Sequence, residues 1–355
     1  MPHPTPTPTL RDISQQTGYA VSTVSLALRN DPCVKPETAQ RIQQVAGELG
    51  YHPNPLVSVL MRQVRDKRTR HERIAVLSCF SESVHRNSHL DPYYRMIHEA
   101  IEERARERGY GLDEFYLGDG MYSDTRIENI LEARGILGVL LCPGHDDPGE
   151  FGHYPTLSSP HLATVLVGLN AFQQNLHHAV TDYYYNIDYA LQRALDGGCK
   201  RIGLVLDKSK DIVTNCAWVS RYLYFQQSIP AKQRVPLLRP LTLAQLRQDV
   251  PAWYKKNRPD VILTAGLPAF RALEEAGIRM PEEVRAINLS KRDNTRMAGI
   301  DPHSELLGKL GVDLLVQLLQ ANQFGPPQYP QTISVKGTWV PGETFPEPES
   351  APARP

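Results

Sequence analysis

The sequence predicts an α/β protein in which a small all-helical head precedes a body of two lobes, each built on a parallel sheet. Three short amphipathic segments interrupted by glycines fill residues 9 to 50. From residue 72 strand-like and helix-like segments alternate, and this cycle runs twice, which predicts two α/β lobes. The 355 residues suffice for two or three domains, and 41% hydrophobic with 22% charged residues is ordinary for a globular chain.

Charge is balanced overall but not along the chain. Lys+Arg and Asp+Glu both number 39, so net charge favours neither a nucleic acid nor a membrane as partner. The first 70 residues, however, hold nine Lys and Arg against five acids. A basic head on a mildly acidic body is expected when only the head meets phosphate, although an ordinary uneven surface fits the same counts.

Three features predict a cytoplasmic protein without a membrane anchor. The longest apolar runs, such as residues 136–142, are too short to span a bilayer. The Pro/Thr-rich residues 1–9 lack the basic-then-apolar layout of a signal peptide. Five scattered cysteines without a C-x-x-C pair fit reduced thiols rather than disulfides or a zinc site.

The head begins with two short helices around a glycine turn. Thr9 precedes a helix over residues 10–16, Gly18 can adopt the positive φ of a helix end, and a second helix is expected over residues 21–28. This arrangement is typical of a helix-turn-helix unit, whose second helix fits the major groove. A packed pair of helices without any DNA contact fits this local pattern equally well.

A third helix is expected over residues 36–49, because Pro36 suits a first turn and Gly50 ends the apolar stripe. Residues 56–65 are apolar and then basic, which predicts a hinge helix over about 55–64 that packs in a dimer and faces phosphates.

The body is predicted element by element. Strands are expected over residues 74–80, 112–117, 138–142, 162–167, 201–206, 261–264, 284–289 and 331–335. Helices are expected over residues 93–108, 124–134, 183–195, 218–228, 243–256, 268–276 and 304–321, the second of them capped by Ser123. The last helix and the last strand would cross back between the lobes.

The head resembles the DNA-binding head of the lactose-repressor (LacI) family, and the spacing agrees without a gap from Thr9 to Leu60. The resemblance is carried by Thr9-Leu10 through Ser25, Arg29-Asn30-Asp31, Thr38, Leu49-Gly50-Tyr51 and Pro53-Asn54. It implies that Val21, Ser22 and Leu26 read bases, that Thr9, Thr23 and Ser25 contact the DNA backbone, and that Leu60 is wedged into the minor groove. Arg29, Tyr51 and Asn54 complete the DNA-binding set that we expect.

Two positions depart from the family pattern. Ala20 stands where a Ser is usual, so the second helix lacks an N-cap side chain, at a cost of about 1 kcal/mol. Leu26 replaces a common Arg, which removes a guanine contact and leaves an apolar group suited to a thymine methyl. We therefore expect an operator sequence unlike that of better-known relatives.

The body resembles the periplasmic-binding-protein-like body of the same family, in a divergent branch. Residues 258–262 and 275–284 are its most recognisable stretches. The resemblance covers about residues 9 to 340 and implies a helix-turn-helix domain over 9–65 and an effector-binding and dimerisation domain over 72–345. Residues 1–8 and 346–355 are expected to be disordered.

An effector is expected in the cleft between the lobes, at the carboxyl ends of the strands. Sugar-responsive relatives carry an Arg and an Asp where this chain has Trp218 and Ser290, so the usual polar clamp is missing. We expect an unidentified small molecule, with carbohydrate derivatives among the candidates, and loss of effector binding stays open. The candidate effector residues are Ser81, Tyr93, Pro143, Trp218 and Ser290.

Other chemistry has little support. His85, His89 and His98 are spaced for a metal site on a helix, but a loop is expected there. His177-His178 is interpreted as a solvated loop, and 208–211 as a charged surface turn. The motifs of nucleophilic hydrolases, zinc proteases and phosphate loops are absent from the sequence, so we expect no enzyme activity, no cofactor and no metal.

Together these features predict a bacterial, sequence-specific transcription regulator, acting as a repressor. It would bind a pseudo-palindromic operator as a homodimer, with its affinity modulated by the effector. The alternative is a solute-binding protein with a vestigial head, which would be expected to carry a signal peptide and no helix-turn-helix.

Overall fold

The protein is described from a computed structural model. The structure describes residues 8–28, 31–51, 72–82, 92–118, 120–142, 155–168, 175–291 and 296–346. The predicted hinge helix, Pro143, His85 and His89 lie outside the described residues, as do residues 1–7 and 347–355 of the two predicted disordered ends.

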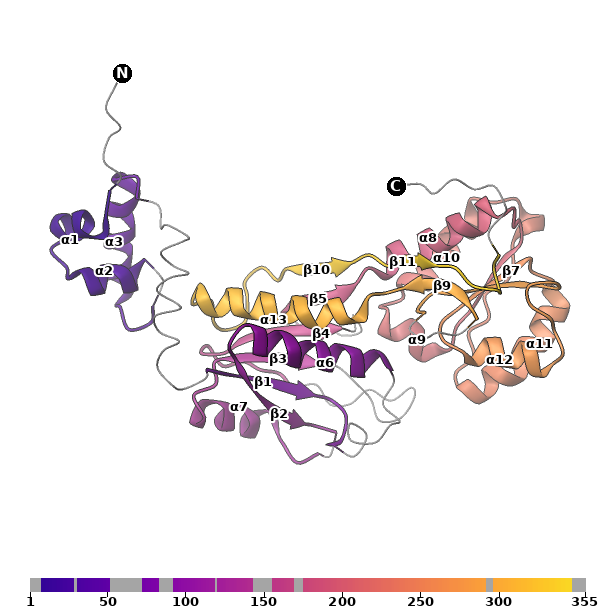
Figure 1. The fold of residues 1–355 in the computed structure, drawn as a ribbon, viewed down its shortest axis with the longest axis horizontal. Coiled ribbons are helices and arrows are strands. Elements are labelled where there is room, and N and C mark those ends of the chain that lie inside the picture. Colours follow the sequence, from indigo (N-terminus) through magenta and orange to yellow (C-terminus); the bar gives the residue numbers. More distant parts are fainter. Residues whose placement is uncertain are drawn as a thin grey trace, which may run out of the picture.

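The head consists of α1 (Leu10–Thr17), α2 (Val21–Ala27) and α3 (Pro36–Glu48). Gly18 ends α1 with a φ of 76°, a left-handed conformation that favours glycine, and its N–H donates to the Ser14 carbonyl. One side chain or more from each helix meets in a small apolar core, made of Ile13, Val24, Ala27, Ile42 and Ala46. The predicted helix-turn-helix is therefore present as a packed three-helix unit (Figure 1).

The first lobe, the N-lobe, contains a six-stranded sheet in the order β10-β5-β4-β3-β1-β2, with every pair parallel. Its strands are β1 (Arg73–Ser78), β2 (Gly111–Tyr116), β3 (Gly138–Cys142), β4 (Ala163–Gly168), β5 (His177–Thr181) and β10 (Thr332–Val335). Helices α6 (Pro92–Glu107) and α13 (Ser304–Gln320) share an apolar cluster on one face, and α7 (Asp124–Ala133) packs on the other (Figure 1).

The second lobe, the C-lobe, contains a five-stranded sheet in the order β11-β9-β8-β7-β6. Its strands are β6 (Ile202–Val205), β7 (Val261–Thr264), β8 (Arg285–Asn288), β9 (Ala298–Asp301) and β11 (Thr338–Val340), the last antiparallel to β9. Helices α8 (Tyr183–Asp196) and α10 (Ala217–Gln227) share one apolar cluster, while α11 (Leu243–Asn257) and α12 (Pro268–Glu275) share another. Two short helices complete the lobe, α9 (Lys208–Val213) and η1 (Ala231–Gln233).

The chain crosses between the lobes three times, after β5, after β9 and after β10, and the crossovers are tied to one another. The Asp182 N–H donates to the Val335 carbonyl at 2.8 Å, and the Gly337 N–H donates to Asn186 Oδ1 at 2.8 Å. Thr338 Oγ1 lies 2.9 Å from His303 Nε2, which joins the second crossover to the third. Movement of one lobe against the other must therefore bend all three segments together.

Most predicted elements are confirmed to within a few residues, and two predictions are wrong. His177 and His178 begin strand β5 instead of forming a solvated loop, and the His178 side chain is buried. Residues 208–211 begin helix α9 instead of forming a turn, because Asp207 caps them by accepting from the N–H groups of Ser209 and Lys210. Strands β9 and β11 were not predicted, since both are short.

Candidate DNA-binding surface and effector cleft

The start of α2 is the open face of the head. Val21 is 40% exposed, although it is a large apolar side chain, and Ser22 beside it is also exposed. Val24 and Ala27 point into the core, which leaves Thr23, Ser25 and Leu26 half-buried between the two faces. As predicted, Ala20 gives α2 no side-chain cap. Val21 and Ser22, two of the three side chains predicted to read bases, thus lie exposed at the end of the helix that enters a groove, whereas the third, Leu26, is half-buried near the other end of α2.

At the start of α1 the Thr9 side chain has a partner within the protein. The Thr9 backbone N–H and hydroxyl both donate to Asp12 Oδ2, at 2.7 and 2.8 Å. These two hydrogen bonds hold the pKa of Asp12 below its ordinary value. A phosphate contact by the Thr9 hydroxyl therefore has to compete with this carboxylate.

Two hydrogen bonds outside the predicted DNA-binding set hold α2 in place. Gln43 Nε2 on α3 donates to the Ala27 carbonyl at 3.1 Å, and Ser14 Oγ on α1 donates to the Tyr19 carbonyl at 2.6 Å. Sequence reasoning missed both residues, because a polar side chain on an amphipathic helix gives no sign of its tertiary partner.

The remaining DNA-binding predictions fall into two groups. Arg29, Asn54 and Leu60 lie outside the described residues. Tyr51 is half-buried and packs against the head core, and its N–H donates to the Ala46 carbonyl at 2.9 Å. Tyr51 thus has a packing role in the head, and its contact with DNA stays a prediction.

On the N-lobe side of the cleft, the structure brings Ser81 and Tyr93 to the carboxyl end of the sheet. Ser81 follows β1 and is buried, and Tyr93 on α6 is only 2% exposed, with its hydroxyl beside Gly168 at the end of β4. Both predicted residues therefore lie at the edge where ligands bind in parallel α/β lobes.

On the C-lobe side, Trp218 is packed more deeply than a stacking role requires. The indole is 2% exposed and meets the Tyr183 ring edge-on, with 5.5 Å between centroids. Trp218 Nε1 and Ser290 Oγ are buried without a hydrogen-bond partner among the described residues. Lys291 beside Ser290 is also buried, and sequence reasoning did not select it. Unpartnered buried donors, here one at the start of α10 and one just after β8, are where a ligand would be expected to bond.

Helix α9 makes contact between the lobes. Val213 at its end belongs to the apolar cluster that covers the N-lobe sheet. The buried Asp211 accepts from Arg239, and the next two residues after the helix cap, Asn215 and Cys216, both have positive φ, at 52° and 58°. Partial desolvation and the nearby Asp211 charge raise the pKa of Cys216, so this thiol stays protonated near neutral pH.

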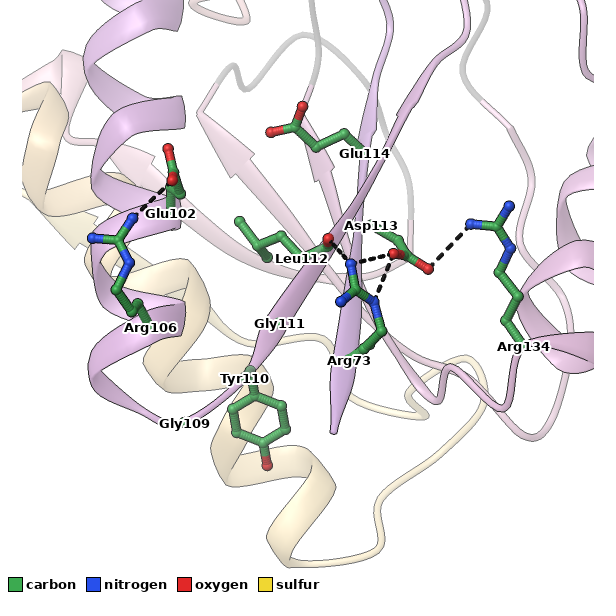
Figure 2. A pocket seen from close by; sticks show the side chains of 10 residues that line it. All are labelled: Arg73, Glu102, Arg106, Gly109, Tyr110, Gly111, Leu112, Asp113, Glu114 and Arg134. Atoms are coloured by element: carbon green, nitrogen blue, oxygen red, sulfur yellow. Dashed lines mark hydrogen bonds and ion pairs between the residues drawn. The ribbon is translucent and has the colours of Figure 1, made fainter. Parts of the chain in front are cut away.

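Two hollows lie on the described surface of the N-lobe. A hollow of about 650 Å³ opens beside the edge strand β2, where Arg73 bonds Asp113 and Arg134 lies 3.2 Å from the same carboxylate (Figure 2). A second, of about 500 Å³, lies between α6 and the start of α13. Among the residues that the structure covers, no group of His, Cys, Asp and Glu is placed to hold a metal, and no helix is long and apolar enough to cross a membrane.

The comparisons with known proteins agree on the head and on the whole fold. Residues 9–54 match the model of bacterial regulatory proteins of the lacI family. The HTH-type transcriptional regulator GalR of Streptococcus thermophilus is 24% identical over 335 residues, which is 88% of this chain and 93% of that protein.

Two solved structures have a similar fold. The lac repressor dimer bound to operator and the anti-inducer ONPF has a TM-score of 0.56 at 17% identity, over 96% of this chain and 100% of that one. The complex of the transcriptional regulator CelR with cellobiose has a TM-score of 0.54 at 19% identity, over 95% of this chain and 99% of that one.

Proposed function

Because this chain is a LacI-family transcriptional regulator, we propose that it represses transcription as a homodimer whose two heads bind the half-sites of a pseudo-palindromic operator. The observation that carries the proposal is the exposed start of α2 on a head that matches the family model from residue 9 to 54. In this proposal Val21, Ser22 and Leu26 read bases, and Leu60 opens a central base step. Its place of action is the cytoplasm, where bacterial DNA lies.

A small molecule in the cleft modulates this binding. The buried donors of Trp218 and Ser290 support a ligand rich in hydroxyl groups, since hydroxyls both accept and donate. The similarity to a CelR–cellobiose complex also favours a carbohydrate. The ligand acts by binding one lobe arrangement better than the other, and coupling between two sites is typically about 1–3 kcal/mol.

Selection of bound sequences from random duplex DNA by the full-length protein tests the function. We expect one pseudo-palindrome to be enriched, and a panel of mono- and disaccharides should include one that weakens its binding. Absence of any enriched sequence, with or without sugars, would contradict the proposal and favour a solute-binding protein with a vestigial head.

The proposed base contacts are tested by Ser22→Ala and Val21→Ala. Each variant removes one exposed base-reading group at no cost to the head core, so we expect the operator affinity of each to fall about 5- to 100-fold. Affinity for random duplex should change little, because phosphate contacts supply non-specific binding. Gln15→Ala, an exposed change on α1, is the matched control. Equal reductions on operator and random DNA would remove these residues from base recognition.

A further inference from the structure

The amino-terminal edge of the C-lobe sheet carries a dense group of cations. Seven side chains form this distal cationic edge: Lys200, Arg201, Lys232, Arg234, Lys255, Lys256 and Arg258. Most of them are exposed, and Arg201 is half-buried. They come from three separate segments, before β6, around η1 and at the end of α11.

Arg201 brings these three segments together. Its guanidinium donates to the backbone carbonyls of Lys232, Asn257 and Arg258. The Asp260 carboxylate accepts the N–H groups of Lys200 and Arg201, at 2.7 and 2.8 Å, and so fixes the same junction. These hydrogen bonds to the backbone thus hold the three cationic segments close together.

Most of the charge of this edge is not neutralised by neighbouring acids. None of the seven cations forms an ion pair with another described residue. Two acids lie nearby: Asp260 accepts the backbone N–H groups of Lys200 and Arg201, and Glu283 pairs with Arg279 and also feels the Arg258 charge, so these two carboxylates offset only part of the seven positive charges. Gathering like charges costs free energy through repulsion, and a bound polyanion would recover it.

We propose that the distal cationic edge binds the phosphate backbone of a second DNA duplex without regard to its sequence. The exposed large apolar side chains of the described chain do not include any from residues 200–201, 231–234 or 255–258, so this edge lacks the anchors that protein partners need. A polar, cationic and lysine-rich surface is typical of non-specific contact with DNA.

The place of the distal cationic edge in the body determines what a DNA contact there would do. The carboxyl ends of both sheets face the cleft, and the head joins the body at residue 72, next to the amino end of β1. The amino ends of β6 and β7 therefore lie at the opposite end of the body from the head. One molecule can hold an operator at one end and a separate stretch of DNA at the other.

Lysine acetylation of the full-length protein tests the proposal directly. With a random-sequence duplex at low salt, we expect Lys200, Lys232, Lys255 and Lys256 to react at least about threefold more slowly, while Lys336 on the far side of the lobe keeps its rate. Polyglutamate of equal charge should protect the same lysines less well than the duplex. Unchanged rates at the four edge lysines would overturn the proposal, and stronger protection by polyglutamate would assign the edge to an acidic protein instead.

A second measurement separates this edge from the head. Protein saturated with one immobilised duplex is offered a labelled second duplex at increasing salt. We expect Lys255→Gln/Lys256→Gln to reduce capture of the second duplex. The slope of log affinity against log salt concentration should become smaller by about 0.9 for each phosphate that is no longer neutralised. Arg247→Gln/Arg271→Gln removes the same charge from exposed positions elsewhere on α11 and α12 and should capture normally. Equal capture by both double variants would contradict the proposal.

Discussion

Tyr222 ties three parts of the C-lobe through one side chain. It is fully buried on α10, and its hydroxyl lies 2.7 Å from the Val235 carbonyl and 3.1 Å from the Ile202 carbonyl at the start of β6. Burial raises the pKa of Tyr222 above its ordinary value, so the phenol stays neutral and keeps its proton for donation. The neighbouring Tyr224 is 67% exposed, and its ring lies beside the Arg221 guanidinium.

Tyr222→Phe is therefore expected to lower the free energy of unfolding by about 1–2 kcal/mol, because the ring is retained but the one hydroxyl proton that two buried carbonyls share is lost. Denaturant unfolding of the full-length protein measures this. Tyr224→Phe on the same helix is the control and should leave stability unchanged. If both variants unfold alike, the buried hydroxyl contributes nothing to the lobe.

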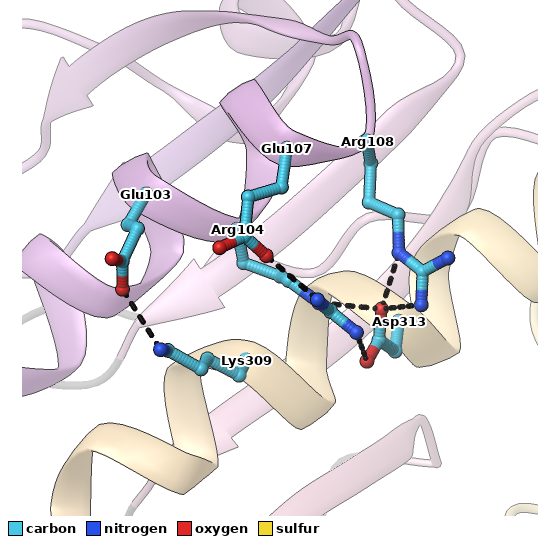
Figure 3. Close-up of polar contacts among 6 residues, drawn as sticks. All are labelled: Glu103, Arg104, Glu107, Arg108, Lys309 and Asp313. Carbon is cyan, nitrogen blue, oxygen red and sulfur yellow. Dashed lines mark hydrogen bonds and ion pairs between the residues drawn. The ribbon is translucent and has the colours of Figure 1, made fainter.

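At the scale of elements, α6 and α13 form the most extensive helix pair of the N-lobe, and a forked ion pair joins their polar sides. Asp313 on α13 accepts from Arg104 at 2.7 Å and from Arg108 at 2.6 Å, while Lys309 meets Glu103 at 2.8 Å (Figure 3). Partial burial raises the pKa of Asp313, but the hydrogen bonds from the two arginines outweigh burial and hold it below the ordinary value.

Because the pKa of Asp313 is lowered in the folded protein, its ion pairs stabilise the fold fully at pH values above the ordinary Asp pKa of about 4. This stabilisation is lost as the pH falls through the lower pKa of the folded state. We expect Asp313→Asn to cost about 1 kcal/mol at neutral pH, the upper range for partly exposed pairs, and less at about pH 3. Asp249→Asn, on the exposed face of α11, serves as the control. A difference between Asp313→Asn and the unmodified protein that stays constant across this pH range would rule out the linkage.

The elements also show what a sequence pattern can predict. Strands β3 and β7 were predicted with their observed bounds, since both are short, continuous apolar runs buried on two faces. Strand β5 was missed because it begins with two histidines, and it pairs with β10 from a distant part of the sequence. Helix α9 is too short for a periodicity signal and depends on the Asp207 cap.

Some residues of the candidate sites could likewise be identified from the sequence, and others could not. The family resemblance of the head selected Val21 and Ser22, and the structure leaves both exposed at the start of α2, because their places follow from local helix geometry. The burial of Trp218 against Tyr183, and of Lys291, depends on how distant elements pack, and no local pattern contains that information.

At the scale of the whole molecule, the tied crossovers decide how the lobes move. Gly337 lies where three segments meet, and a β-carbon there would be 2.4 Å from Ile300 Cγ2 and 2.7 Å from the Asp301 carbonyl oxygen. No side chain fits without spreading the crossovers. The position therefore sets how closely the third crossover approaches the second.

Gly337→Ala is expected to reduce the free energy of unfolding by roughly 1–3 kcal/mol, the usual cost of overpacking. Thermal unfolding of the full-length protein gives the readout. Gly47→Ala, on the exposed side of α3 where an added β-carbon meets nothing within 4 Å, is the matched control and should be neutral or stabilising. A Gly337→Ala protein as stable as this control would show that the crossovers accommodate the added methyl group.

The three crossings also determine which parts of the chain can be exchanged by recombination. Most of the C-lobe, residues 183–301, is inserted between the two stretches that build the N-lobe, so neither lobe is one continuous piece of the gene. A single recombination event therefore cannot replace one whole lobe and so give the protein a new effector response. The head, which is continuous from α1 to α3 and has its own core, can be exchanged in one piece. A chimaera that joins a foreign head to residues 72–346 of this chain would keep the response of the body and change only the operator that it serves.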